Sequence, residues 1–110
     1  MSAHSPEDLN VLYDAALEFG ENFRRPIVEL AAERLPLLPT DVRSELADLV
    51  ERTRTEVELH IEGEYARYGD AWPDEAKVAV HDWITDQYPW MDERNVSHAI
   101  SQGVYFAWHG

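Results

Sequence analysis

The residues best placed to do chemistry are two glutamates and a histidine spaced four apart, Glu56, His60 and Glu64. Side chains at that spacing climb one face of an α-helix, where carboxylate and imidazole groups can share a metal ion. One helix supplies too few ligands, so His81 or His98 would have to complete the site. The alternative is a hydrogen-bonded pair of His60 and Glu64 at the core edge, worth roughly a few tenths of a kcal/mol. We favour this pair and expect neither a tightly bound metal nor a cofactor.

Nucleophilic catalysis has little support in the sequence. Ser97 and His98 are neighbours, so on a helix their side chains point about 100° apart, although Ser101 lies closer to His98. The chain contains no glycine-rich nucleophile elbow and no phosphate-binding loop. It also contains no cysteine, which excludes a thiol nucleophile, a disulfide framework and a thiolate metal site. We therefore expect that the protein is not an enzyme.

Acidity is the strongest global property of the chain. Nine Lys and Arg residues face 22 Asp and Glu residues, which gives a net charge of −13. Such a chain is repelled by nucleic acid and by anionic lipid and is attracted to basic surfaces. The acid either keeps a small protein soluble, adapts it to high salt, or forms a docking face for a cationic partner.

The sequence shows neither a secretion signal nor a membrane-spanning stretch. The first nine residues, MSAHSPEDL, lack the basic region and the apolar run of a signal peptide. No stretch approaches the ~18 apolar residues of a membrane-spanning helix. We expect a cytoplasmic protein with no direct contact to membrane or nucleic acid.

A long helix over residues 40–68 is the element around which the rest is expected to pack. Apolar side chains recur in it at steps of three and four residues, which places them on one side. They include Val42, Leu46, Leu49, Val50, Val57, Ile61, Tyr65 and Tyr68. Thr40 is predicted to cap its start, and Gly69 to end it in a left-handed conformation. Gly63 predicts either a kink or the close passage of a neighbour.

The opposite side of this helix carries a row of acids, and we predict that a partner binds there. This acidic row comprises Asp48, Glu51, Glu58 and Glu62. Carboxylates at such steps repel one another slightly, and no lysine is interleaved with them. Trp72 and Trp90 sit in proline-containing turns that place them on corners. We include both as partner-binding residues, with Trp90 either folded into the core or exposed as an aromatic anchor.

Four further helices are predicted around the long one. They cover residues 5–23, with Phe19 and Phe23 inward and Gly20 as a bend, then 26–35, 73–87 and 92–108. The leucines at 35, 37 and 38 are expected to fill the end of the core. Gln87 and Trp108 are assigned to inner faces. No strand pattern is sustained, so we predict an all-α class, with residues 1–110 forming one compact domain of four main helices and a short one.

A ridge of small residues, Ala99, Gly103 and Ala107, runs along the last predicted helix. Small side chains let another helix approach closely, either within the domain or across a homodimer seam. The leading hypothesis is a non-enzymatic acidic protein that docks on a basic protein surface, as inhibitors and immunity proteins of similar size, charge and helicity do. The alternatives are a metal-binding helical protein using Glu56, His60 and Glu64, and a structural subunit of a homo-oligomer.

Overall fold

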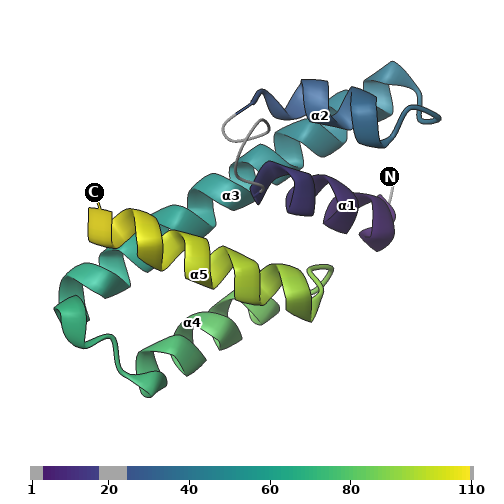
Figure 1. Cartoon of the computed structure of the whole chain (residues 1–110). Helices are drawn as coiled ribbons and strands as arrows, with labels where there is room; N and C mark the ends of the chain where they lie inside the picture. Colours follow the sequence, from purple (N-terminus) through teal and green to yellow (C-terminus); the bar gives the residue numbers. More distant parts are fainter. Residues whose placement is uncertain (1–3, 18–24, 110) are drawn as a thin grey trace. The chain divides into compact units, whose positions relative to one another are not determined.

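The computed structural model describes residues 4–17 and 25–109, and it is all-α as predicted (Figure 1). The helices are α1 (Pro6–Leu17), α2 (Ile27–Arg34), α3 (Thr40–Tyr68), the short 3₁₀ helix η2 (Gly69–Ala71), α4 (Asp74–Gln87) and α5 (Glu93–His109). Four main α-helices and one short one were predicted, and this arrangement is confirmed. No strand occurs within the described ranges. The predicted continuation of the first helix to residue 23, with Phe19, Gly20 and Phe23, lies outside the described residues.

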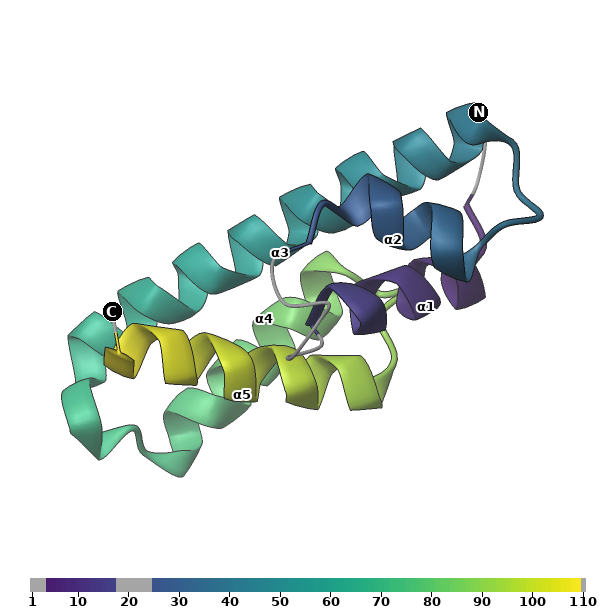
Figure 2. The ribbon, with the colours of Figure 1, turned by 45° about the horizontal axis from the view of Figure 1, so that its top comes forward.

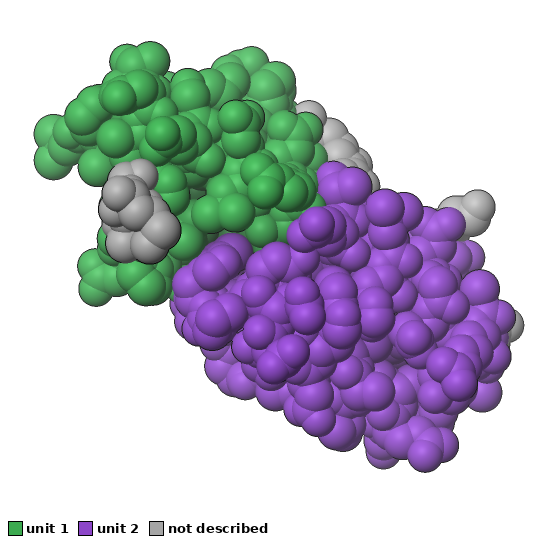
Figure 3. Space-filling model, turned by 180° about the vertical axis from the view of Figure 1, so that it is seen from behind, with its two compact units in different colours: residues 1–54 green, residues 55–110 purple. Residues whose placement is uncertain are grey.

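The chain divides into two compact units, residues 1–54 and residues 55–110 (Figure 3). The first unit contains α1, α2 and the N-terminal half of α3, and the second contains the C-terminal half of α3 with η2, α4 and α5. That residues 1–110 behave as one domain stays a prediction.

The boundaries of α3 follow from its end residues. The helix begins at Thr40. Its hydroxyl accepts a hydrogen bond from the Arg43 guanidinium at 3.2 Å, so it pairs with a side chain of the first turn. Gly69, directly after the helix, has φ +65°, the left-handed conformation that glycine adopts at least cost. A Cβ added at Gly63 would meet nothing within 4 Å, so the expected close neighbour at Gly63 is wrong.

The first unit has an apolar core contributed by all three of its helices. Its buried side chains include Leu9, Leu12, Tyr13, Ile27, Leu30, Leu46 and Val50. In both ribbon views α2 runs beside the N-terminal half of α3 (Figures 1 and 2). Leu35 is buried, as predicted for the connector, but Leu37 is 96% exposed. The prediction for Leu37 is wrong because the Leu38 amide bonds back to the Leu35 carbonyl at 3.2 Å, and this turn directs Leu37 outward.

The second unit packs α4 and α5 against the C-terminal half of α3. Its buried side chains include Val57, Ile61, Ala76, Val80, Ile84, Val96 and Ala99. Asp92 caps α5 as predicted, because its Oδ1 accepts the Asn95 amide at 2.9 Å. A Cβ on Gly103 would lie 2.5 Å from Ile61 Cδ1, so α5 and α3 approach closely there. The packing interpretation of the small-residue ridge is therefore confirmed at Gly103.

Three predictions on the faces of α4 and α5 need qualification. Ala99 is buried within the unit, as Gly103 is. Ala107 is partly exposed, so it is the residue of the small-residue ridge that a second copy could contact. Gln87 is exposed because it ends α4. Trp108 is 62% exposed, since it lies about 140° around α5 from Gly103, well away from the side that meets α3.

Candidate functional site

The three residues proposed as metal ligands are engaged in different ways. The His60 ring stacks on the Trp83 indole, with centroids 3.8 Å apart and planes 2° from parallel. Glu56 accepts a hydrogen bond from the Tyr88 hydroxyl at 2.6 Å. His60 therefore uses its ring face toward α4, in place of the expected bond to Glu64. Across the described residues, no three His, Asp or Glu side chains converge closely enough to hold a metal ion.

His60 belongs to a row of rings that we call the inner aromatic row, which comprises His60, Trp83, Tyr88 and Trp90. The Trp83–Tyr88 and Tyr88–Trp90 pairs meet edge to face, at 5.9 and 6.3 Å between centroids. Burial, followed by the hydrogen bond to Glu56, raises the pKa of the Tyr88 hydroxyl, so the phenol stays neutral and donates. Trp90 is half-buried at the end of this row. Its contact with the Tyr88 ring favours a Trp90 folded into the core over a Trp90 exposed as an aromatic anchor.

His81 joins α4 to α5 through two carboxylates. Its Nε2 bonds Glu93, with Oε2 at 3.1 Å, and its Nδ1 lies 3.4 Å from Asp82 Oδ1. The Glu93 bond, more than Asp82, raises the His81 pKa. Ser97 lines the same cavity of about 370 Å³ as His81. Carboxylates on both nitrogens favour the imidazolium, which has no lone pair to take a proton from Ser97.

The acidic row divides between the two units. Asp48 and Glu51 are exposed in the first unit, where they line a cleft of about 350 Å³ together with Arg25 and Arg54. Two arginines line the same cleft, and the guanidinium of one of them, Arg25, pairs with Glu29 and Glu33. In the second unit Glu62 is exposed and Glu58 is partly buried. Glu62 is therefore the member of the row that is exposed in the second unit.

Charge is also uneven between the units. Residues 55–110 hold 11 acidic residues and three basic ones, a net charge of −8 out of the total of −13. Of the three bases, Lys77 lies 3.6 Å from Asp74, and the Arg67 guanidinium lies 5.8 Å from the centre of the Tyr68 ring. The second unit thus presents a strong negative field.

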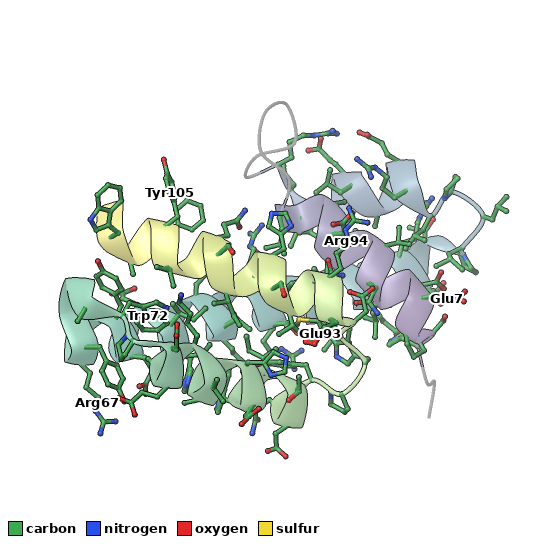
Figure 4. All side chains as sticks on the ribbon, turned by 60° about the horizontal axis from the view of Figure 1, so that its bottom comes forward. Glu7, Arg67, Trp72, Glu93, Arg94 and Tyr105 are labelled. Carbon is green, nitrogen blue, oxygen red and sulfur yellow. The ribbon has the colours of Figure 1, made fainter. Side chains whose placement is uncertain are left out.

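A second group of rings lines a cavity of about 370 Å³ in this acidic unit. We call it the aromatic pocket, and its rings are Tyr65 from α3, Trp72 from the turn after η2, and Tyr105 and Trp108 from α5, with Ser101 and Val104 completing the lining. Figure 4 shows Tyr105 extending from α5, with Trp72 and Arg67 beside the end of α3. Tyr105 is 49% exposed and Trp108 62% exposed, so the pocket opens to solvent.

Trp72 is held in this pocket by its backbone as well as by ring contacts. Its φ of 24° and ψ of 70° lie on the left-handed side, where a bulky side chain is strained. Its indole lies 5.9 Å from the Tyr65 ring and 6.3 Å from the Tyr68 ring. Trp72 was predicted as a partner-binding residue, and it lines an open cavity. Ser101, Tyr105 and Trp108 share one face of α5 by their spacing, a pattern that could have been noticed in the sequence.

No family model, curated protein or solved structure matches this chain. Over the described ranges, no helix combines the length and apolar character needed to cross a membrane. The three clusters of the second unit differ in what they can do chemically. The inner aromatic row is engaged in packing, the His81 cluster is closed by ion pairs, and the aromatic pocket is open and belongs to the acidic unit.

Proposed function

We propose that this chain is a non-enzymatic binding protein that docks on a basic segment of another protein, as an inhibitor or immunity protein does. The binding surface is that of residues 55–110. The observation that supports it is the coincidence of two features in one unit, a net charge of −8 and an open aromatic pocket. Aromatic anchors and electrostatic complementarity are the two features that supply affinity and association rate in protein interfaces.

The position of the acids supports the same surface. Glu62 precedes Tyr65 by three residues and Glu64 precedes Tyr68 by four, so each carboxylate neighbours a ring on the surface of α3. Asp74 and Glu75 follow Trp72 in the first turn of α4. A basic segment approaching the pocket would meet these carboxylates first. The Asp48–Glu51 part of the acidic row is a weaker candidate because Arg25 and Arg54 share its cleft.

Selection from a library of random twelve-residue peptides, with the immobilised full chain as bait, tests this proposal. The selected peptides should be enriched in Lys and Arg. Their association rate constants should fall steeply between 50 and 300 mM salt, because exposed charges are screened beyond about 8–10 Å at physiological ionic strength. Peptides with no basic enrichment, or binding that ignores salt, would contradict the proposal.

A pair of charge-matched variants locates the surface. Glu62→Gln with Glu75→Gln removes two exposed carboxylates from the second unit, and Asp48→Asn with Glu51→Gln removes two from the first. The first variant should slow association of a selected peptide by about tenfold, in the range over which charge steering acts. The second should slow it much less. Equal rates for both variants would show that the effect is one of total charge alone.

Self-association is the second candidate, and one observation favours it. Val78, Tyr105 and Trp108 are apolar or aromatic side chains at least 49% exposed on α4 and α5 of the same unit. Such side chains can meet in a second copy, although a net charge of −13 opposes it. Sedimentation velocity over a hundredfold concentration range separates the two. A constant monomer mass supports the heterologous partner, and a mass that doubles supports the homo-oligomer.

A further inference from the structure

The aromatic pocket is large enough for one side chain but small for a cofactor. Its volume of about 370 Å³ lies near the lower end of the ~300–1,000 Å³ range of ligand sites. Its rings present π faces and edges, and Ser101 adds one hydroxyl. The lining contains no cation and no carboxylate. What enters the pocket must therefore be recognised by the rings themselves and by the field of the acids around them.

Rings in a negative field are a receptor for positive charge. The face of an indole or phenol ring attracts an ammonium or guanidinium within about 6 Å of its centre. The unit already contains one such contact at the edge of this cluster, because Arg67 lies 5.8 Å from the centre of the Tyr68 ring, and Tyr68 meets Trp72 edge to face. The carboxylates of Glu62, Glu64 and Glu75 are near in sequence to the rings and add to the attraction.

The backbone of Trp72 is an independent sign that this ring is positioned for a task. A non-glycine residue on the left-handed side is strained, and such residues cluster at binding sites. Gly69, three residues earlier, adopts the left-handed conformation without that cost. The Trp72 amide bonds the Gly69 carbonyl at 3.3 Å, so the turn holds the strained residue in place.

We infer that the pocket of Tyr65, Trp72, Tyr105 and Trp108 binds the cationic end of a lysine or arginine side chain, by contact with the aromatic rings. This inference rests on the proposed function, of which it names the central contact. The partner's basic segment places one long side chain in the pocket, and its remaining charges face the surrounding carboxylates. An apolar side chain in the same pocket is the competing occupant.

Nuclear magnetic resonance of the full chain tests this directly. The probes are N-acetyl-lysine methylamide, N-acetyl-arginine methylamide and the neutral, similarly shaped N-acetyl-norleucine methylamide. Each of the four tryptophans gives one indole N–H signal, so Trp83 and Trp90 of the inner aromatic row act as internal controls. The cationic probes should shift the Trp72 and Trp108 signals, leave Trp83 and Trp90 unchanged, and bind about 3- to 30-fold more tightly than norleucine, the range expected for a cation over a ring.

Variants separate the rings from the general charge. Trp108→Leu keeps an apolar side chain at an exposed position and should remove most of the preference for lysine over norleucine. Val78→Ala, an exposed change on α4 outside the pocket, should leave that preference intact. Norleucine binding as tightly as lysine, or cationic probes that leave the Trp72 and Trp108 signals unmoved at tens of millimolar, would overturn the inference.

The outcomes also distinguish this inference from the proposed function. If basic peptides are selected and bind with steep salt dependence, yet Trp72 and Trp108 do not respond to them, the acidic surface stands and the cation pocket fails. If the lysine probe occupies the pocket but no basic peptide is selected, the pocket stands as a small-cation site and the docking function fails.

Discussion

Gly103 shows how one hydrogen atom in place of a side chain fixes the distance between two helices. Its neighbour is the Ile61 side chain, whose Cδ1 would be 2.5 Å from an added Cβ and whose own Cβ would be 3.3 Å away. The methyl end can rotate, but the Ile61 Cβ is fixed to α3. A small residue at 103 can therefore be accommodated in part, whereas a large one must separate α5 from α3.

Gly103→Leu is expected to lower the free energy of unfolding by about 1–3 kcal/mol through overpacking, as measured by urea denaturation. Helix propensity alone would change stability by up to about 1 kcal/mol in the opposite direction. Gly63→Ala is the matched control, because nothing lies within 4 Å of that position, and it should raise stability by up to about 1 kcal/mol. A more stable Gly103→Leu variant would show that α5 does not pack on Ile61.

His81 makes the stability of the protein depend on pH. Glu93, with Asp82 as a smaller contribution, raises the pKa of His81 above its ordinary value of about 6.5, and Lys77 is the other charged group in the cavity. A raised pKa in the folded state means that the stabilisation is complete below about pH 6.5. It is lost as pH rises through the folded-state pKa.

Replacing Glu93 with glutamine should remove the larger part of this pH dependence, because Asp82 remains. The wild type should exceed Glu93→Gln in stability by a few tenths to about 1 kcal/mol at pH 6, since the pair is partly exposed, with 39% and 66% of its side chains accessible. The difference should shrink toward pH 9, apart from a constant contribution of Glu93 at the start of α5. A difference that is constant from pH 6 to pH 9 would exclude a paired His81.

At the scale of the helices, α3 and its exit turn show what periodicity predicts well. Apolar steps of three and four residues predicted a helix over 40–68, and Gly69 marked its end, because local spacing and backbone sterics act within a few residues. The same reasoning found Asp92 as the cap of α5. These signals require no knowledge of what lies across the core.

What periodicity did not predict is which side chains meet between elements. His60 was paired with Glu64 on its own helix, but its ring stacks on Trp83 of α4. Trp108 was placed on the inner face, although the angle of α5 is set by Gly103 and turns Trp108 outward. The aromatic pocket was missed for the same reason, because its rings come from three separate segments. Trp72 alone was identified, from its position beside Pro73.

The turn after α3 is expected to be sensitive to substitution at Gly69. An alanine there meets no atom within 4 Å, so its effect comes from φ +65° and not from crowding. Gly69→Ala should lower the free energy of unfolding by about 1–2 kcal/mol, the cost of a left-handed L-residue. Gly69→Asn should lower it by less, since asparagine adopts that conformation more readily. Equal losses for alanine and asparagine would point to a cause other than the backbone angle.

At the scale of the whole molecule, net charge sets how the protein responds to salt. With 22 acidic and nine basic residues, and one lysine in the whole sequence, we expect repulsion among carboxylates to exceed attraction within ion pairs. Ion pairs such as Arg25 with Glu29 and Lys77 with Asp74 each include an exposed carboxylate, so they contribute little. The excess of negative charge is therefore expected to lower the stability of the fold. Binding to a cationic partner is one reason why the chain would keep it.

Stability should therefore rise with ionic strength. The melting temperature in sodium chloride should increase between about 10 mM and 1 M, as the screening length falls from ~30 to ~3 Å. Glu62→Gln with Glu75→Gln should raise stability at low salt, by roughly a few tenths of a kcal/mol for each carboxylate, and should reduce the response to salt. Arg52→Gln, an exposed change on α3 that makes the chain more negative at similar helix propensity, is the control of opposite sign and should steepen that response.

A melting temperature that falls as salt is added would mean that ion pairs dominate. The carboxylates of the second unit would then not lower the stability of the free protein, so a cationic partner would relieve no repulsion by binding. The aromatic pocket would have to attract its ligand without help from the negative field of these carboxylates.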